Sequence, residues 1–160
     1  MEKIKTCSFT GHRRIRLEDK DALASLLKRG VKYAYDQGCR RFLAGGAIGF
    51  DTMAALAVLE LRDSHPDARL VLVLPCRDQD RYFSFEQKKT YRAILDSADE
   101  LIYTSEVYTD TCMLRRNEYL AKNADVMLAY LYRERSGASQ TVRLAREYGA
   151  VVYNLARSAS

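Results

Sequence analysis

The chain has 160 residues and a formal net charge of +5, with 48% hydrophobic and 29% charged residues. This length fits one folded domain, and we expect that domain over residues 1–157, followed by a short frayed tail at 158–160. No apolar run approaches the roughly 20 residues of a membrane span, and the start of the chain lacks the apolar stretch of a signal peptide. We therefore expect a cytoplasmic protein with no membrane partner, whose positive charge favours anionic partners.

The four cysteines are Cys7, Cys39, Cys76 and Cys112, and no two of them form a C-x-x-C pair. In a reducing compartment this spacing is typical of free thiols, and it fits neither a zinc site nor a disulfide framework. We expect no metal site and no required cofactor.

Short apolar runs alternate with helical patterns along the whole chain. In chain order, the first half predicts a strand at 6–10, a helix at 23–35 that stops at Gly38, a strand at 41–44, a helix at 50–61, a turn at 64–67 and a strand at 70–74. The second half predicts a helix that opens with a capping box at 84–87, a strand at 101–103, a helix near 112–122, a strand at 126–130, a helix at about 139–148 and a strand at 151–153.

Two kinds of spacing support these assignments. The helices carry apolar residues three and four positions apart, whereas the run at 70–74 is apolar throughout, as in a parallel strand that is buried on both faces. Strict alternation of strand and helix predicts the α/β class, with one doubly wound, mostly parallel sheet and helices on both of its faces.

The segment 43–51, LAGGAIGFD, places three glycines within five positions directly before a helical pattern. Glycine lets the backbone turn sharply and approach a ligand, and the N–H groups at a helix start form an anion site. We interpret the segment as a phosphate-cradling turn with ligand-binding residues Gly45, Gly46, Ala47, Gly49 and Phe50. The alternative is a tight strand-to-helix turn in which Gly49 serves packing. The Lys-Ser/Thr pair of a P-loop is absent, which argues against a phosphoryl-transfer ATPase or GTPase.

Charged side chains beside this turn are further candidates. Asp51 lies in the first turn of the helix, where it either interacts with the helix dipole, accepts a ribose hydroxyl, or acts as the catalytic base of an enzyme. Arg13 follows Gly11 at the end of the first strand, and its guanidinium suits a phosphate, although a plain surface arginine is the alternative. His12 is an acid–base candidate, but a lone loop histidine is more often structural.

Ligands of open α/β sheets sit outside the carboxyl ends of the strands. Residues that follow the other strands therefore join the predicted ligand-binding set, namely Pro75, Arg77, Arg116, Asn117 and Gly137. Cys76 also follows a strand, but no histidine stands at a suggestive position to activate it, so we do not expect covalent catalysis. Three tyrosines lie close enough to strand ends to stack on a base: Tyr82, Tyr108 and Tyr130.

Three elements in order, Gly11-His12-Arg13, the glycine segment through Asp51, and Arg116-Asn117, resemble the SLOG superfamily of Rossmann-like domains, which includes DprA and the LOG phosphoribohydrolases. The segments 72–79 and 141–145 resemble its YpsA-like branch, and the likeness runs over about residues 4 to 155. It implies a Rossmann-like fold that binds a nucleotide derivative, with ADP-ribose-related molecules as the leading class. One departure is Ser136-Gly137-Ala138, where relatives tend to have Gly-Gly-Thr.

The resemblance carries ligand-binding roles onto matching positions: Gly11, Arg13, Gly45, Gly46, Gly49, Asp51, Arg116 and Asn117. Three functions follow, in order of preference. The first is binding or sensing of a small nucleotide derivative of the ADP-ribose or NAD class. The second is LOG-like hydrolysis of the N-glycosidic bond of a nucleoside monophosphate, with Asp51 as the base. The third is DprA-like binding of single-stranded DNA, which the lack of a basic tract interleaved with aromatics disfavours. The sequence leaves open whether the protein forms a homo-oligomer.

Overall fold

The alternation of strands and helices is present in the computed structural model, which describes residues 4–156. The strands are β1 (Lys5–Gly11), β2 (Cys39–Ala44), β3 (Arg69–Leu74), β4 (Glu100–Tyr103), β5 (Val126–Tyr130) and β6 (Val151–Asn154). The helices are α1 (Lys20–Asp36), α2 (Phe50–Ser64), α3 (Phe85–Ser97), α4 (Cys112–Asn123) and α5 (Gly137–Glu147), with short 3-10 helices η1 (Leu17–Asp19) and η2 (Gln79–Tyr82). The predicted frayed tail at 158–160 lies outside the described residues.

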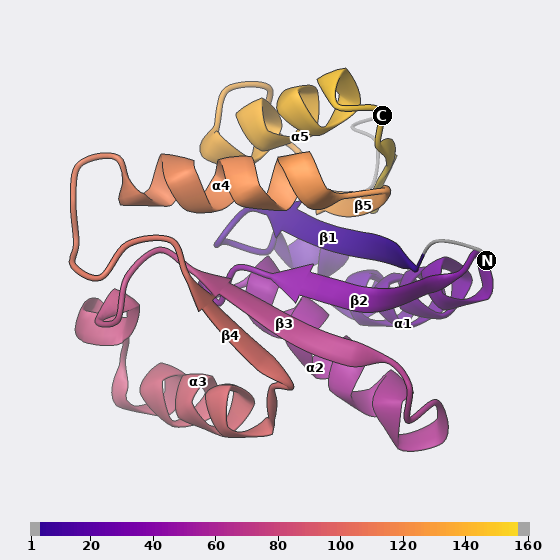
Figure 1. Ribbon diagram of the computed structural model, residues 1–160, viewed down its shortest axis with the longest axis horizontal. Helices are drawn as coiled ribbons and strands as arrows, with labels where there is room; N and C mark the ends of the chain where they lie inside the picture. The colour runs from indigo at the N-terminus through magenta and orange to yellow at the C-terminus, as the bar shows by residue number, and fades with distance from the viewer. Residues whose placement is uncertain (1–3, 157–160) are drawn as a thin grey trace.

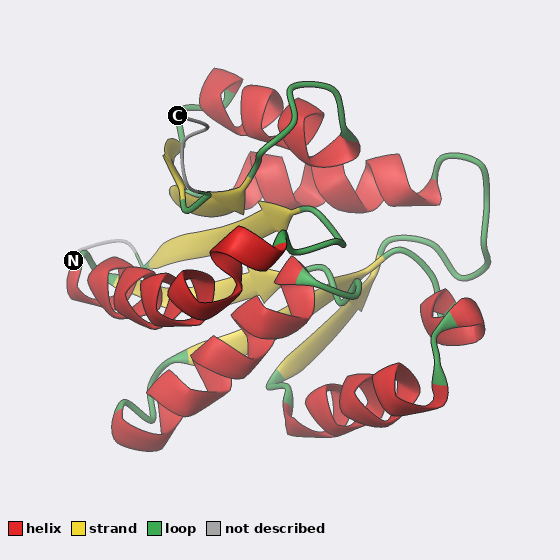
Figure 2. Cartoon of the chain, turned by 180° about the vertical axis from the view of Figure 1, so that it is seen from behind, coloured by secondary structure: helices red, strands yellow, loops and turns green. Residues whose placement is uncertain are grey.

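All neighbouring strands of the sheet are parallel, in the order β4-β3-β2-β1-β5-β6. The chain proceeds outward from β1 to β4, then returns to the other side of β1 to form β5 and β6. Helices α1, α2 and α3 cover one face, and α4 and α5 cover the other (Figures 1 and 2). The predicted doubly wound, Rossmann-like fold is therefore confirmed, and the carboxyl ends of the strands point toward the left of Figure 1.

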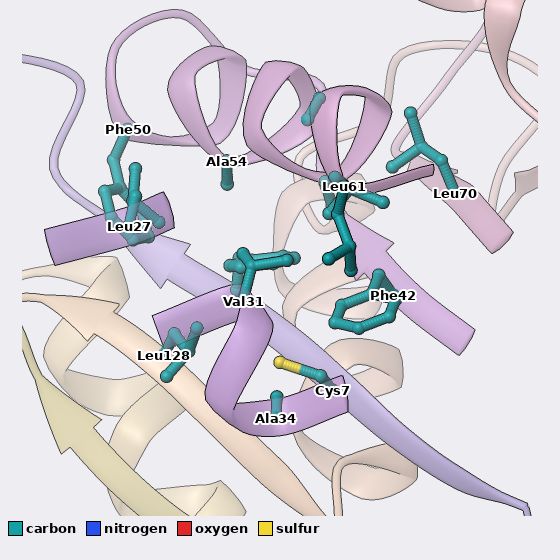
Figure 3. Packing of buried hydrophobic residues seen from close by; sticks show 14 of the residues in the cluster. Cys7, Leu27, Val31, Ala34, Phe42, Phe50, Ala54, Leu61, Leu70 and Leu128 are labelled. Atoms are coloured by element: carbon teal, nitrogen blue, oxygen red, sulfur yellow. The ribbon is translucent and has the colours of Figure 1, made fainter. Parts of the chain in front are cut away.

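Side chains of β3 show why its sequence is apolar without interruption. Leu70, Leu72 and Leu74 belong to the large core shared with α1, α2 and α3 (Figure 3). Val71 and Val73 point to the opposite face, where they pack with residues of α4. Successive residues of a strand face opposite sides of the sheet, so a strand covered by helices on both sides needs apolar residues at every position.

Two helix starts are fixed by reciprocal side-chain caps. The predicted capping box of α3 is confirmed, because Gln87 N donates to Ser84 Oγ at 3.2 Å and Ser84 N donates to Gln87 Oε1 at 2.9 Å. Helix α5 has the same arrangement between Ser136 and Ser139, with distances of 2.9 and 3.0 Å. The cap makes α5 begin at Gly137, two positions before the predicted start, since Ser139 lies inside the first turn.

No helix within residues 4–156 is long and apolar enough to cross a membrane. The four cysteines are buried and unpaired.

Candidate functional site

The strand order reverses between β1 and β5, and a cavity of about 370 Å³ opens there. At such a point the loops after two adjacent strands lead to opposite faces of the sheet and leave a crevice between them. Open α/β sheets bind their ligands in this crevice. The cavity, hereafter the arginine cavity, brings together these predicted site residues: Gly11, His12, Arg13, Ala47, Asp51, Arg116, Asn117 and Gly137. Its further lining residues are Thr10, Arg14, Met113, Leu120, Arg133, Ser136 and Ala138.

Four arginines give this cavity its charge: Arg13, Arg14, Arg116 and Arg133. Asp51 is the one carboxylate of the lining. Arg13, Arg14 and Arg133 are exposed, and the ion pairs found within residues 4–156 involve other arginines and two lysines. Three exposed arginines in the lining of one cavity favour an anionic ligand, above all a phosphate.

Arg116 and Asp51 form the floor of the arginine cavity. Arg116 is 5% exposed; its Nη1 donates to the carbonyl oxygen of Gly45 at 2.5 Å, and its Nε donates to Asn117 Oδ1 at 2.8 Å. Asp51 is 7% exposed, and its Oδ2 accepts the N–H of Ala47 at 3.3 Å. A Cβ on Gly45 would lie 2.6 Å from Arg116 Nη1 and 2.8 Å from Asp51 Oδ2. The missing side chain of Gly45 therefore makes room for both charged groups.

Burial sets the ionisation of this pair. It raises the pKa of the Asp51 carboxyl, while the charge of Arg116, the N–H of Ala47 and the charge of Arg13 act in the opposite direction. Burial also lowers the pKa of the Arg116 guanidinium, and Asp51 opposes that change. Each group thus offsets part of the desolvation cost of the other. A carboxylate with a raised pKa at the base of a cavity is suited to accept a hydroxyl or to take up a proton.

The glycine turn is packed from several sides by the protein itself. A Cβ on Gly49 would lie 2.0 Å from the carbonyl oxygen of Arg13, and one on Gly11 would lie 2.4 Å from the ring of Phe50. Phe50 N donates to the carbonyl oxygen of His12 at 3.3 Å. The turn and the loop after β1 are therefore held against each other, as the packing interpretation of Gly49 requires.

This packing limits the phosphate cradle that the sequence predicts. The N–H groups of Ala47 and Phe50 are bonded inside the protein, and Gly45 and Gly46 are buried. Ala47 and Asp51 are the residues of the turn that line the arginine cavity, whereas Gly45, Gly46, Gly49 and Phe50 lie outside its lining. The exposed arginines, which come from other loops, supply most of the cationic lining.

His12 holds the loops after β1 and β5 together. Its Nε2 accepts the N–H of Tyr132 at 3.1 Å, its ring meets that of Tyr132 edge-on at 4.3 Å, and it is 4% exposed. Burial lowers the pKa of His12, and the charges of Arg133 and Arg16 lower it further. A neutral ring whose acceptor nitrogen already binds a backbone N–H serves structure, which agrees with the structural alternative for His12.

Pro75 and Arg77 do not line the arginine cavity. Pro75 is buried, and the exposed Arg77 donates from Nε to Glu106 Oε2 at 2.6 Å and lies 4.3 Å from the ring centre of Tyr103. Cys76 is 1% exposed, and burial raises the pKa of its thiol to about 11. A buried thiol with so high a pKa is a poor nucleophile.

A second cavity, of about 560 Å³, adjoins the first and shares Arg13, Ala47 and Met113 with it. We call it the tyrosine cavity, because Tyr82 and Tyr108 are in its lining, 86% and 55% exposed. The expectation that Tyr130 stacks on a base is wrong. Tyr130 is fully buried, with its hydroxyl donating to Asp19 Oδ2 at 2.5 Å.

Sequence reasoning missed Arg133 as a site residue. It stands three positions after the end of β5, and the rule that picked the residues after the other strands would have found it. Met113 carried no such signal, because a methionine at helical spacing is usually part of a core.

Comparison with known proteins gives one family and several distant relatives. The profile of the YspA SLOG family matches residues 7–149. The SPbeta prophage-derived protein YoqJ of Bacillus subtilis is 27% identical over 147 residues, covering 83% of this chain and 82% of YoqJ.

Two solved structures share the fold. DNA processing protein A of Streptococcus pneumoniae has a TM-score of 0.67 at 18% identity, covering 98% of this chain and 51% of that one. The same protein of Helicobacter pylori, described with its single-stranded DNA binding mode, has a TM-score of 0.64 at 20% identity, covering 93% and 64%. This chain therefore spans less than two thirds of the length of either structure.

Proposed function

The chain belongs to the YspA SLOG family, and from this membership together with the site geometry we propose that it binds or senses a nucleotide or nucleotide derivative in the arginine cavity. The observation that carries the proposal is the lining, with four arginines and a single carboxylate at the point where the strand order reverses. A cavity with this excess of guanidinium groups favours a ligand with several negative charges.

The ADP-ribose and NAD class fits the placement of these arginines better than a mononucleotide. Its members carry two linked phosphates. The arginines of the cavity come from two loops, with Arg13 and Arg14 after β1 and Arg133 after β5, so each loop can bind one of the two phosphates. Asp51, on the cavity floor, takes a ribose hydroxyl, since a carboxylate would repel a phosphate placed against it.

Isothermal titration of the wild-type protein against ADP-ribose, NAD, AMP and a short single-stranded oligonucleotide tests the proposal. We expect heat from ADP-ribose or NAD, with weaker binding of AMP. Absence of heat from all of the small ligands would sink the proposal. Binding of the oligonucleotide alone, weakening steeply with salt, would assign the cavity to nucleic acid instead.

A second candidate, hydrolysis of an N-glycosidic bond, rests on Asp51 alone. Its carboxyl is buried at the cavity floor with a raised pKa, as suits a group that exchanges a proton with water. The assay is release of free base from AMP, compared between wild type and Asp51→Asn. Release that the substitution abolishes would favour the enzyme, and intact AMP after long incubation with wild type would leave binding as the function.

A further inference from the structure

We propose that the tyrosine cavity holds the aromatic base of the ligand whose phosphates occupy the arginine cavity. The inference rests on the proposed function and deepens it, because it assigns the two ends of the ligand to two chemically different compartments. It makes Tyr82 and Tyr108 ligand-binding residues.

The two cavities adjoin each other and share part of their lining. Arg13, Ala47 and Met113 border both of them, so the guanidinium groups of the first and the rings of the second lie on either side of these three residues. Ala47 carries only a methyl group at this boundary. One ligand can therefore reach from the arginines into the tyrosine cavity by passing over the glycine turn.

The tyrosine cavity suits a flat aromatic group. Its lining includes the rings of Tyr82, Phe83 and Tyr108, together with the apolar side chain of Ile48. Tyr82 leaves 86% and Tyr108 leaves 55% of its surface exposed beside this hollow. Rings left exposed beside a cavity offer the faces on which bases stack.

Arg81 links the two walls of this cavity. Its guanidinium lies 4.8 Å from the ring centre of Tyr82 and 5.8 Å from that of Tyr108, and its Nη1 is 3.7 Å from Asp78 Oδ2. Tyr82 ends η2, whereas Tyr108 belongs to the loop between β4 and α4. The cation therefore keeps rings from two segments near each other, which favours a stacking site formed in advance of binding.

Polar groups are also present at the edge of this cavity. Gln79 and Gln87 are in the lining. Gln79 is held by its contacts with the Gly45 carbonyl oxygen at 3.3 Å and with Arg116 Nη1 at 3.4 Å, and Gln87 is held by the capping box. The Gln79 amide nitrogen also contacts the Tyr91 hydroxyl at 3.4 Å, so both of its N–H donors have partners inside the protein. The capping box uses only the amide oxygen of Gln87, whose nitrogen can read the hydrogen-bonding edge of a base.

Calorimetry with matched ligands and variants tests the assignment. Wild type, Tyr82→Leu, Tyr108→Leu and the control Tyr148→Leu are each titrated with ADP-ribose, AMP and ribose 5-phosphate, which lacks a base. Tyr148 is 49% exposed, follows directly after α5 and lines neither of the two cavities. We expect the cavity variants to bind ADP-ribose and AMP roughly 5- to 100-fold more weakly, and ribose 5-phosphate as wild type does.

The outcomes separate the two proposals. Wild-type affinity for ADP-ribose in both cavity variants would overturn the tyrosine cavity while leaving the arginine cavity intact. An equal loss for ribose 5-phosphate would also overturn it, because the tyrosines would then act on the phosphate end. No binding of any of the three ligands to wild type would overturn both proposals.

A fluorescence measurement gives an independent readout, since the chain contains no tryptophan. In Tyr82→Trp the single indole reports on stacking directly. We expect its emission to be quenched by ADP-ribose and unchanged by ribose 5-phosphate. Unchanged emission with ADP-ribose, in a variant that calorimetry shows to be saturated, would place the base outside this cavity.

Discussion

Arg116 Nη1 donates to the carbonyl oxygen of Gly45 at 2.5 Å, joining two residues that are 71 positions apart in the chain. The bond connects α4, on one face of the sheet, to the turn at the edge of the sheet that leads from β2 into α2, and α2 covers the other face. The buried guanidinium also faces the carboxylate of Asp51. The glycine turn is therefore shaped by a charged pair of the protein itself, and the arginine cavity lies above that pair.

The first prediction concerns the lack of space for a side chain at Gly45. Gly45→Ala should lower the free energy of unfolding by about 1–3 kcal/mol, because the new Cβ would lie 2.6 Å from Arg116 Nη1. Gly45 does not have a positive φ, so the substitution tests space alone. Urea denaturation measures the change. Gly137→Ala is the control, since its Cβ would meet Asn117 Nδ2 only at 3.7 Å, and equal losses in the two variants would contradict the expectation.

The second prediction concerns the charges of Arg116 and Asp51 beneath the arginine cavity. Arg116→Met should lower the free energy of unfolding by about 1–3 kcal/mol, because it removes the main opposite charge beside the buried carboxylate of Asp51 and the donor to the Gly45 carbonyl oxygen. The double variant Arg116→Met, Asp51→Asn should recover part of this loss. Arg115→Met, on the exposed side of α4, serves as the control and should change stability little. Urea unfolding of wild type, Arg116→Met, Asp51→Asn and the double variant supplies the four values of the cycle. A double variant that loses the sum of the two single losses would argue against coupling.

The third prediction concerns the pH dependence of stability that the buried His12 causes. The folded pKa of His12 is lowered from 6.5 by burial, with Arg133 and Arg16 acting in the same direction. As the pH falls below 6.5, the unfolded chain takes up the proton before the folded one, so the stability that His12 contributes is complete above 6.5 and is lost toward lower pH. Urea unfolding between pH 7.5 and 5 should show this decrease in wild type and in His65→Gln, and a smaller one in His12→Gln. An unchanged slope in His12→Gln would contradict it.

The fourth prediction concerns Arg133, which lies in the loop after β5. Arg133→Ser should weaken binding of ADP-ribose roughly tenfold, because a hydrogen bond to a charged group contributes about 1.5–3 kcal/mol when it is desolvated. Arg29→Ser removes the same charge from the exposed side of α1 and should leave the affinity near that of wild type. Calorimetry at constant ionic strength compares the two. Equal losses would mean that overall charge, and not this cavity, sets the affinity.

Much of the fold could be predicted from the sequence because its signals are local. Apolar spacing distinguishes strand from helix, as in the run at 70–74, and the cap at Ser84 marks a helix start. The start of α5 was missed because Ser139 reads as an ordinary helical residue unless its bond back to Ser136 is known. Tyr130 was misplaced for a similar reason, since its buried hydroxyl partner Asp19 is 111 positions away.

By itself, the sequence determined the α/β class and the alternation of elements and pointed to the edge of the sheet where the candidate site lies, since these depend on spacing between neighbouring residues. Only the tertiary structure decided what surrounds the glycine turn. It placed Arg116 and Asp51 against Gly45, buried His12 between two loops, and set the arginine cavity beside the tyrosine cavity. Those outcomes depend on contacts between segments far apart in the chain, which strand order and packing create and which local spacing does not encode.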